Sequence, residues 1–221
     1  MHFELKIPDP TTMLVGQEEY IVVPKATVLH RIHPVRFDPV TFNDTTAGTA
    51  RFSPIYNAGS IIPTIYAAQS FATAVCERIL RSPDVPTTAT VAGCPHIICP
   101  SDHADLVYSK IETQMDLNLV SLTTAGQRRL GVSHNALVAG PRSTYPKTRA
   151  WAEMIHRSCP TAQGLFYTSL QYGPEYALLL FGDRLPAGSI TANGSVSVAE
   201  TVCHDAIFEL ARSLSIDYVD I

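Results

Sequence analysis

The chain has 221 residues, 46% of them hydrophobic, so it can bury one substantial core and shows no composition shift that demands a second domain. Its 16 basic and 20 acidic residues give a net charge of −4, which disfavours direct binding of nucleic acid. No apolar run approaches the roughly 20 residues of a membrane span, and the N-terminus lacks a basic segment followed by a long apolar one, so we expect a cytoplasmic protein without a membrane anchor.

The N-terminal part of the chain predicts an arm followed by a strand. The first 24 residues contain three prolines and little periodicity, which is typical of an extended arm that covers a sheet edge or a partner. Residues 27–33 alternate as a strand does. If the core takes Val28 and Ile32, then Arg31 faces the opposite way.

A loop and a second strand come next. Prolines, glycine and Asn-Asp punctuate residues 34–50, so this segment is predicted to be a loop that leads the chain to Arg51. Residues 61–66 are apolar and rich in β-branched side chains, which favours a buried strand. That strand is predicted to end at Tyr66.

The helix that follows carries a glutamate away from its apolar side. Ser70 supplies an N-cap for a helix from residue 71 to about residue 80. The core-facing stripe, at a spacing of four, consists of Phe71, Val75 and Ile79. At 100° per residue, Glu77 lies roughly 120 to 160° from the ends of that stripe, so it projects from the helix flank.

The second half of the chain alternates between strands and helices. Strand-prone segments are residues 87–99, 117–122, 164–167 and 176–181. Helices are predicted at residues 124–130 and from Pro146 onward. Ser197 and Glu200 have the spacing of a capping box for a C-terminal helix, whose apolar residues are Val202, Ala206 and Leu210.

The cysteines do not form a recognisable framework. Their number, five, is odd, and in a chain of this length without a secretory signal we expect reduced and mostly buried thiols. Cys94, His96, Cys99 and His103 are metal-type ligands, but Pro95 interrupts the spacing that a structural zinc site requires. Ordinary core and loop positions are therefore favoured over a metal site.

The polar residues named so far also have ordinary structural explanations. A glutamate such as Glu77 on a helix flank commonly pairs with a surface cation, and Arg51 would suit a turn. Arg31 would suit a pair with a buried carbonyl, and Tyr66 would suit the core. Ser169 would suit a turn between strands. It does not resemble an acyl-transfer nucleophile, because the G-x-S-x-G pattern is absent.

Taken in order, the motifs resemble the RES domain family, which is named for its arginine, glutamate and serine. The resemblance covers roughly residues 28–186. Its elements are LHRIH with Arg31, RFSP with Arg51, a strand with Tyr66, an alanine-rich helix with Glu77, the helix YPKTRAWAEMIH, and GLFYTSLQYG with Ser169. In the family an arginine often follows the serine, whereas Leu170 stands here, which weakens a second anion contact at that point.

The resemblance implies an α+β fold, with one ADP-ribosyltransferase-like domain whose mixed, split β-sheet core is flanked by helices. The domain would span residues 28–186. An N-terminal extension would occupy residues 1–27, and a C-terminal extension with a helix packed on the domain would occupy residues 187–221.

The resemblance also implies a toxin that degrades NAD by cleaving its nicotinamide–ribose bond, as an NAD glycohydrolase or an NAD phosphorylase. NAD would be the substrate, with no cofactor and no metal. The expected partner is a cognate antitoxin with a helix-turn-helix domain, and both a monomer and a homodimer remain open. Two alternatives also remain: transfer of ADP-ribose to a macromolecule, and a catalytically inactive module that binds a partner.

Site roles follow from the same resemblance and from the chemistry of the bond. Cleavage builds positive charge on the ribose, so Glu77 would act as the carboxylate that stabilises it. The chain has no glycine-rich phosphate loop, so Arg51 and Arg31 would bind the pyrophosphate. Tyr66 would stack on the nicotinamide and Ser169 would hold the ribose. Glu77, Arg51 and Tyr66 would thus be catalytic, while Arg31, Arg51, Tyr66 and Ser169 would bind NAD.

Overall fold

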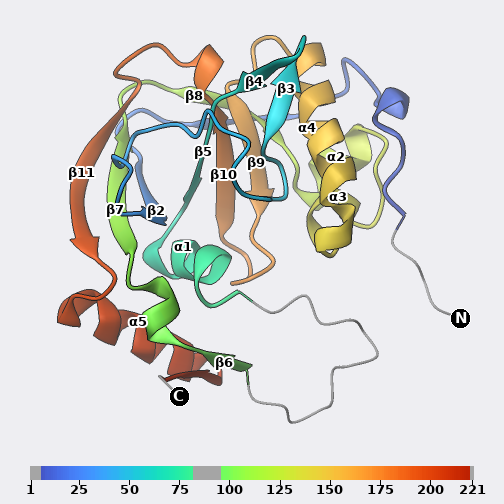
Figure 1. Cartoon of the computed structure of the whole chain (residues 1–221). Helices are drawn as coiled ribbons and strands as arrows, with labels where there is room; N and C mark the ends of the chain where they lie inside the picture. Colours follow the sequence, from blue (N-terminus) through green and yellow to red (C-terminus); the bar gives the residue numbers. More distant parts are fainter. Residues whose placement is uncertain (1–5, 82–95, 220–221) are drawn as a thin grey trace, which may run out of the picture.

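Most strands join one large curled sheet in the computed structural model, which describes residues 6–81 and 96–219 (Figure 1). Its strand order is β1-β8-β9-β10-β5-β2-β7-β11. The bounds are β1 (Tyr20–Val23), β2 (Val28–Pro34), β5 (Thr64–Ala68), β7 (Leu106–Thr113), β8 (Leu117–Ser121), β9 (Gly164–Thr168), β10 (Tyr176–Phe181) and β11 (Ile190–Ser197). Two small sheets pair β3 (Ile55–Asn57) with β4 (Ser60–Ile62) and β6 (His96–Ile98) with β12 (Ile216–Tyr218).

The large sheet is mixed and nearly divided in the middle. Strands β8 and β9 are parallel, and the other neighbours are antiparallel. Within the described ranges, β2 and β5 share a single paired position, His30 with Ala68, whereas every residue of β2 pairs with β7. The α+β prediction, with a mixed and split sheet flanked by helices, is therefore confirmed.

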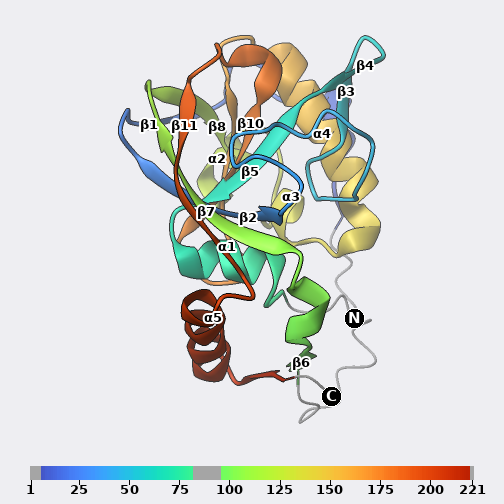
Figure 2. The ribbon, with the colours of Figure 1, turned by 60° about the vertical axis from the view of Figure 1, so that its left-hand side comes forward.

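The helices form two groups beside the sheet. Their bounds are α1 (Phe71–Arg78), α2 (Thr124–Arg129), α3 (Ala136–Ala139), α4 (Tyr145–Ser158) and α5 (Thr201–Ser213), with 3-10 turns η1 (Pro10–Thr12), η2 (Pro100–His103), η3 (Arg142–Thr144) and η4 (Gly182–Arg184). Figure 2 shows α1 between the sheet and α5, while α2, α3 and α4 gather at the other end of the molecule. No helix of the described ranges combines the length and apolarity that a membrane crossing requires.

Each group of helices covers its own part of the core. Trp151 and Ile155 of α4 are fully buried against the sheet and against Phe52. Val75 of α1 and Ile207 of α5 belong to a second buried cluster. Buried apolar side chains of the helices therefore tie both groups to the same sheet.

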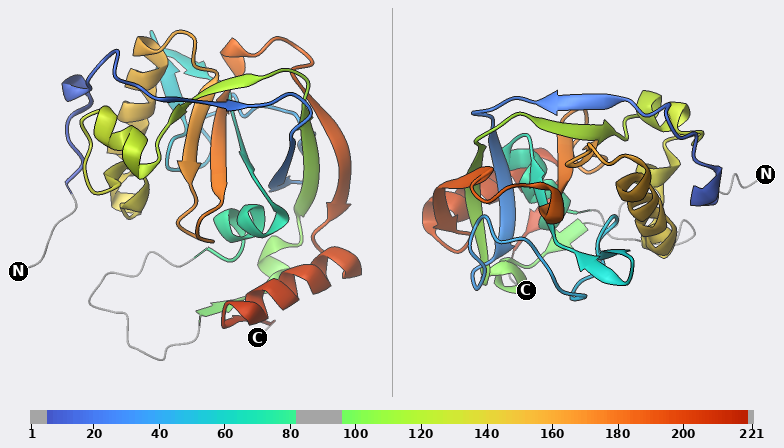
Figure 3. Two further views of the ribbon diagram at one scale, coloured as in Figure 1. Left: turned by 180° about the vertical axis from the view of Figure 1, so that it is seen from behind. Right: turned by 90° about the horizontal axis from the view of Figure 1, so that it is seen from above.

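The N-terminal segment lies along one edge of the sheet. Strand β1 pairs with β8 and forms the end of the strand order, as seen from behind and from above in Figure 3. The indole N–H of Trp151 donates to the carbonyl oxygen of Pro8 at 2.8 Å. The arm predicted for the first 24 residues thus contributes an edge strand and is anchored to α4.

The predicted strand at residues 61–66 is wrong as one element. Pro63 divides it into β4, which belongs to a hairpin, and β5, which belongs to the large sheet. Proline has no N–H for a ladder hydrogen bond, so the chain changes direction there. As a consequence Tyr66 lies in the middle of β5, which continues to Ala68, and does not end the strand.

Two predicted apolar faces differ from the structure. In β2 Leu29 is fully buried and Val28 is exposed, while Ile32, which was expected beside Val28, is half-buried against two core clusters. In α5 the buried residues are Cys203, Ile207 and Ala211, because the helix begins at Thr201 with Glu200 as its N-cap. The proposed capping serine, Ser197, is instead the last residue of β11.

Several other predicted elements are confirmed, with small changes at their ends. They are α1 with its Ser70 cap, β8, α2, α4 with Pro146 in its first turn, β9 and β10. Strands β7 and β11 were missed. Of the predicted strand at residues 87–99, residues 87–95 lie outside the described residues and His96–Ile98 forms β6.

Candidate active site

Strands β5, β10 and β9 bring two distant segments to one edge of the large sheet. Both β5 and β9 pair antiparallel with β10, so their C-terminal ends lie at the same edge, beside Tyr176. Helix α1 begins directly after β5, and the loop that carries Ser169 begins directly after β9. The sheet thereby places Ser169 next to α1.

Ser169 and Glu77 form a direct hydrogen bond. The Ser169 hydroxyl donates to Oε1 of Glu77 at 2.6 Å, across 92 positions of sequence. Ser169 is 1% exposed, and its Oγ also accepts the backbone N–H of Gln171 at 3.2 Å. The hydroxyl has a single proton, which it donates in the hydrogen bond to the carboxylate, while its oxygen is held by the N–H of Gln171 in the loop.

Arg51 and Tyr66 lie within electrostatic range of the same carboxylate. Burial raises the pKa of Glu77, and the charge of Arg51 is among the effects that oppose this rise. Burial likewise raises the pKa of Tyr66, with smaller effects of the charges of Arg51 and Glu77. The Tyr66 hydroxyl accepts the backbone N–H of Phe52 at 2.9 Å, which fixes the ring beside the turn that carries Arg51. Four of the five predicted site residues are therefore brought together, from a turn, a strand, a helix and a loop.

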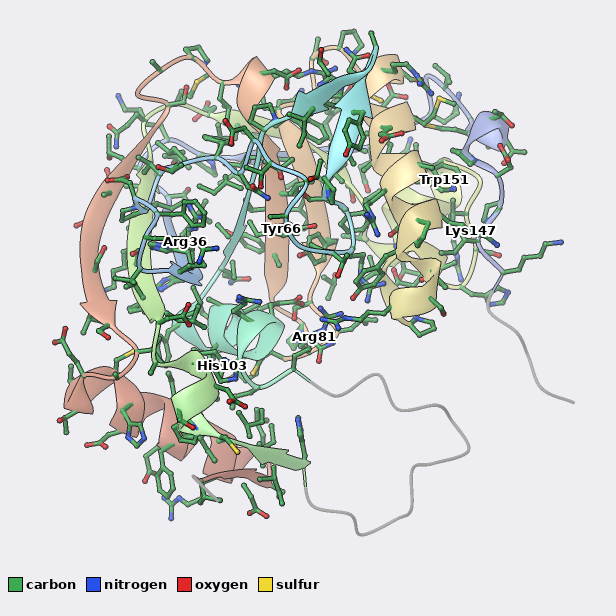
Figure 4. All side chains as sticks on the ribbon, viewed as in Figure 1. Arg36, Tyr66, Arg81, His103, Lys147 and Trp151 are labelled. Carbon is green, nitrogen blue, oxygen red and sulfur yellow. The ribbon has the colours of Figure 1, made fainter. Side chains whose placement is uncertain are left out.

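Two further residues complete the cluster and were not predicted as site residues. Arg51 lies over the ring of Tyr145, with its Cζ 4.9 Å from the ring centroid, and Arg81 lies 5.6 Å from the same centroid. The Arg81 guanidinium also donates to the Tyr145 hydroxyl, while Arg51 Nη1 donates to the carbonyl oxygen of Gly140 at 2.8 Å. Figure 4 shows Tyr66 in front of the central strands and Arg81 just beyond the end of α1.

Burial and charge act in opposite directions on Glu77. Burial raises the pKa of this carboxyl, while the Ser169 hydrogen bond and the charges of Arg81 and Arg51 lower it. Burial also raises the pKa of Tyr66 and of Tyr167, so both phenols stay neutral. The arrangement is one half-buried carboxylate, two guanidinium groups and neutral aromatic rings.

Arg31 is not part of this cluster. Alternation along β2 places it on the opposite face from His30, and His30 pairs with Ala68, which shares a face of β5 with Tyr66. Its Nη1 donates to the carbonyl oxygen of Pro39 at 2.5 Å, and burial lowers its pKa to about 10. The contact with a buried carbonyl is the structural role considered for Arg31 above, and a contact with NAD stays a prediction.

The described residues offer neither a metal cluster nor a reactive thiol at this site. No group of three His, Cys, Asp or Glu side chains in the described ranges could hold a metal ion, and Cys94 lies outside those ranges. Cys76 precedes Glu77 but is fully buried, and burial raises its thiol pKa to about 12. The groups that the described residues bring together here are a carboxylate, two guanidinium groups and hydroxyls.

The signals that sequence reasoning missed were weak but present. Tyr145 opens the Tyr-Pro segment that contributed to the family resemblance, although no role was inferred for it. Arg81 follows the predicted helix by one residue, and in sequence it is no more than a candidate surface cation for Glu77. Its position over the Tyr145 ring depends on how α4 packs, which no local pattern encodes.

Comparison with known proteins identifies the family. The RES domain family matches residues 28–199, which is most of the chain, so this protein belongs to the RES domain family. No curated protein matches the chain in sequence. A similar solved structure is that of the M. tuberculosis MbcT-MbcA toxin-antitoxin complex, with a TM-score of 0.59 and 14% identity over 86% of this chain and 92% of the other. At that identity the likeness shows a shared fold.

Proposed function

We propose that this protein is a toxin that degrades NAD by cleaving the bond between nicotinamide and ribose. The observation that carries the proposal is the Glu77 carboxylate, held by Ser169 at 2.6 Å and placed within electrostatic range of Arg51 and Tyr66. Family membership and the shared fold support it.

The chemistry of this bond matches a site with one available carboxylate. When the bond breaks, its electron pair moves to the pyridinium nitrogen, so nicotinamide leaves as a neutral molecule and needs no proton from the enzyme. Positive charge grows on the ribose, as in glycoside hydrolysis, and a nearby carboxylate stabilises it. Glu77 takes that role. Ser169, through its hydroxyl, keeps the carboxylate oriented.

The other groups of the cluster have roles in binding. NAD carries a pyrophosphate, and the planar guanidinium of Arg51 suits its oxygens better than an ammonium group would. The Tyr66 ring presents an apolar face for the nicotinamide. Arg31 faces the other side of β2, so its contact with the pyrophosphate stays a separate prediction that this cluster does not support.

The experiment is to incubate the purified protein with NAD and to follow free nicotinamide. The wild type should release it, and Glu77→Ala should not. Glu209→Ala is the matched control, because Glu209 is an exposed carboxylate of α5 paired with Arg212. No release by the wild type, or equal release by Glu77→Ala, would reject the proposal.

The products separate the remaining versions of the reaction. Free ADP-ribose would identify water as the acceptor, and a phosphorylated ADP-ribose would identify phosphate. Label from NAD found on a protein band would identify transfer to a macromolecule. Binding of NAD without turnover would support a module that only binds.

The partner is proposed to be a cytoplasmic antitoxin with a helix-turn-helix domain. The similar structure comes from a toxin–antitoxin complex, which supports a protein partner. Expression of the wild type should stop the growth of a host that lacks the antitoxin, and expression of Glu77→Ala should not. Co-expression of the cognate antitoxin should restore growth and form a complex that survives gel filtration.

A further inference from the structure

Glu175 is a carboxylate bound to the first turn of α1. Its Oε2 accepts hydrogen bonds from the hydroxyls of Ser70 and Thr73. Ser70 is the N-cap of α1, and its Oγ accepts the backbone N–H of Thr73 at 3.1 Å. A negative charge at the start of a helix is also favoured by the helix dipole. Glu175 thus fixes the end of α1 that lies farthest from Glu77.

The same residue closes the loop that carries Ser169. The backbone N–H of Ser169 donates to the carbonyl oxygen of Glu175 at 2.8 Å, so the loop begins and ends at one hydrogen bond. At its start, Ser169 binds Glu77 in the last turn of α1. At its end, Glu175 binds the first turn. The loop is therefore attached to α1 at both ends of the helix.

Attachment at two points fixes an orientation that one point would not. The β9–β10 ladder holds the base of the loop, but with the Ser169 contact alone the loop could still shift relative to α1. The distance between Ser169 Oγ and Glu77 Oε1 would then vary. With Glu175 in place, the helix and the loop move as one unit. Because hydrogen bonds to ionised groups weaken when their geometry loosens, the second attachment matters for the first.

We propose that Glu175 is a positioning residue for the site, which locks the loop at residues 169–175 onto α1 so that the Ser169 hydroxyl stays on the Glu77 carboxylate. Its effect on catalysis rests on the proposed function, but its effect on Glu77 does not. In the described contacts Glu175 bonds to Ser70, Thr73 and Ser169 and not to Glu77.

The test uses the full chain with Glu175→Ala and two readouts. The first is the titration of the Glu77 side chain, followed by carbon NMR on glutamate-labelled protein. Besides burial, the groups that act on the pKa of this carboxyl are the Ser169 hydroxyl and the cations Arg81 and Arg51, while the Glu77 charge itself raises the pKa of the two neighbouring phenols, Tyr66 and Tyr167. Since Ser169 favours the ionised form, loosening it should move the titration to higher pH. The second readout is nicotinamide release, whose kcat near neutral pH should fall about tenfold with a smaller change in KM.

Three further variants separate positioning from stability. Glu175→Gln keeps the chain length and an acceptor oxygen, so it should restore the wild-type titration. Thr123→Ala removes the side-chain cap of α2, where Thr123 Oγ1 accepts the N–H of Gly126 at 3.2 Å, and it should lower stability without moving Glu77. In a Ser169→Ala background, Glu175→Ala should cause no additional shift.

The proposal would be overturned by a Glu175→Ala protein that is less stable but in which Glu77 titrates as in the wild type. Glu175 would then only cap a helix. If Glu175→Ala does not fold, Thr73→Val removes one of the two hydroxyl donors and should give a smaller shift in the same direction. An unchanged titration in that variant would equally overturn the proposal. Absence of nicotinamide release by the wild type would reject the proposed function, while the titration would still decide the role of Glu175.

Discussion

Ser169→Ala removes the one hydroxyl that donates to the Glu77 carboxylate among the described contacts. The hydrogen bond is 2.6 Å long, and Ser169 is 1% exposed, so water cannot readily replace the lost donor. A hydrogen bond to an ionised group contributes roughly 1.5 to 3 kcal/mol. Its loss should therefore disfavour the ionised form of Glu77 by about ten- to a hundredfold in equilibrium constant.

The sign of the pH effect follows from the direction of that change. The Ser169 hydroxyl lowers the pKa of Glu77, so its removal raises the pKa. If ionised Glu77 drives the reaction, the acidic limb of the kcat profile moves to higher pH. Below the new limb kcat should fall by about ten- to a hundredfold, and at higher pH much of it should return.

The assay is nicotinamide release by both proteins across roughly pH 5 to 9, a range that brackets a raised carboxyl pKa. Ser109→Ala is the matched control, because Ser109 is fully buried and its Oγ lies 2.8 Å from His33 Nε2 and 2.8 Å from Ser195 Oγ. That variant should lose stability and keep the wild-type profile. An unchanged acidic limb in Ser169→Ala, or an equal displacement in Ser109→Ala, would refute the reasoning.

Three other substitutions have defined outcomes. Burial raises the folded-state pKa of Glu77, so ionisation of this carboxyl opposes folding. Glu77→Gln should therefore increase the thermal stability measured at about pH 8, and this gain should disappear near pH 4, where Glu77 is protonated. The same variant should release no nicotinamide. Equal stability differences at both pH values would contradict this. Arg51→Lys replaces a planar guanidinium, whose Nη1 donates to the carbonyl oxygen of Gly140 at 2.8 Å, with a point charge. In steady-state kinetics the KM for NAD should rise about tenfold, with a smaller change in kcat. A change confined to kcat would argue against a binding role. Trp151→Phe loses the hydrogen bond to Pro8 and leaves a void, so the free energy of unfolding measured in urea should fall by about 2 kcal/mol. The folded variant should keep its activity. A loss below about 0.5 kcal/mol would show that this anchor is unimportant.

The local elements of the site could be predicted because short-range physics determines them. Ser70 caps α1 as expected, since its hydroxyl accepts an N–H three residues later in the same turn. Strands β9 and β10 follow from runs of leucine and aromatic residues interrupted by a polar turn. The order of these motifs was also enough to recognise the family.

Besides the strand that Pro63 divides and the missed strands β7 and β11, errors arose where one residue of register decides the outcome. Val28 and Leu29 are both apolar, and they lie on opposite faces of the strand. Because Arg31 shares a face with Leu29, the choice of which residue is buried decides what surrounds Arg31. The same ambiguity shifted the buried side of α5 by one position. Contacts with a neighbouring strand or helix resolve such choices, and a single sequence does not reveal which elements become neighbours.

The sequence by itself determined which segments become helices and strands around Glu77 and Ser169, because capping, proline restrictions and apolar periodicity act within a few residues. The tertiary structure decided that these two side chains meet, because β10 pairs with both β5 and β9 and so brings their ends to one edge. It also decided that Arg31 lies on the far side of β2, since strand pairing fixes which face points where.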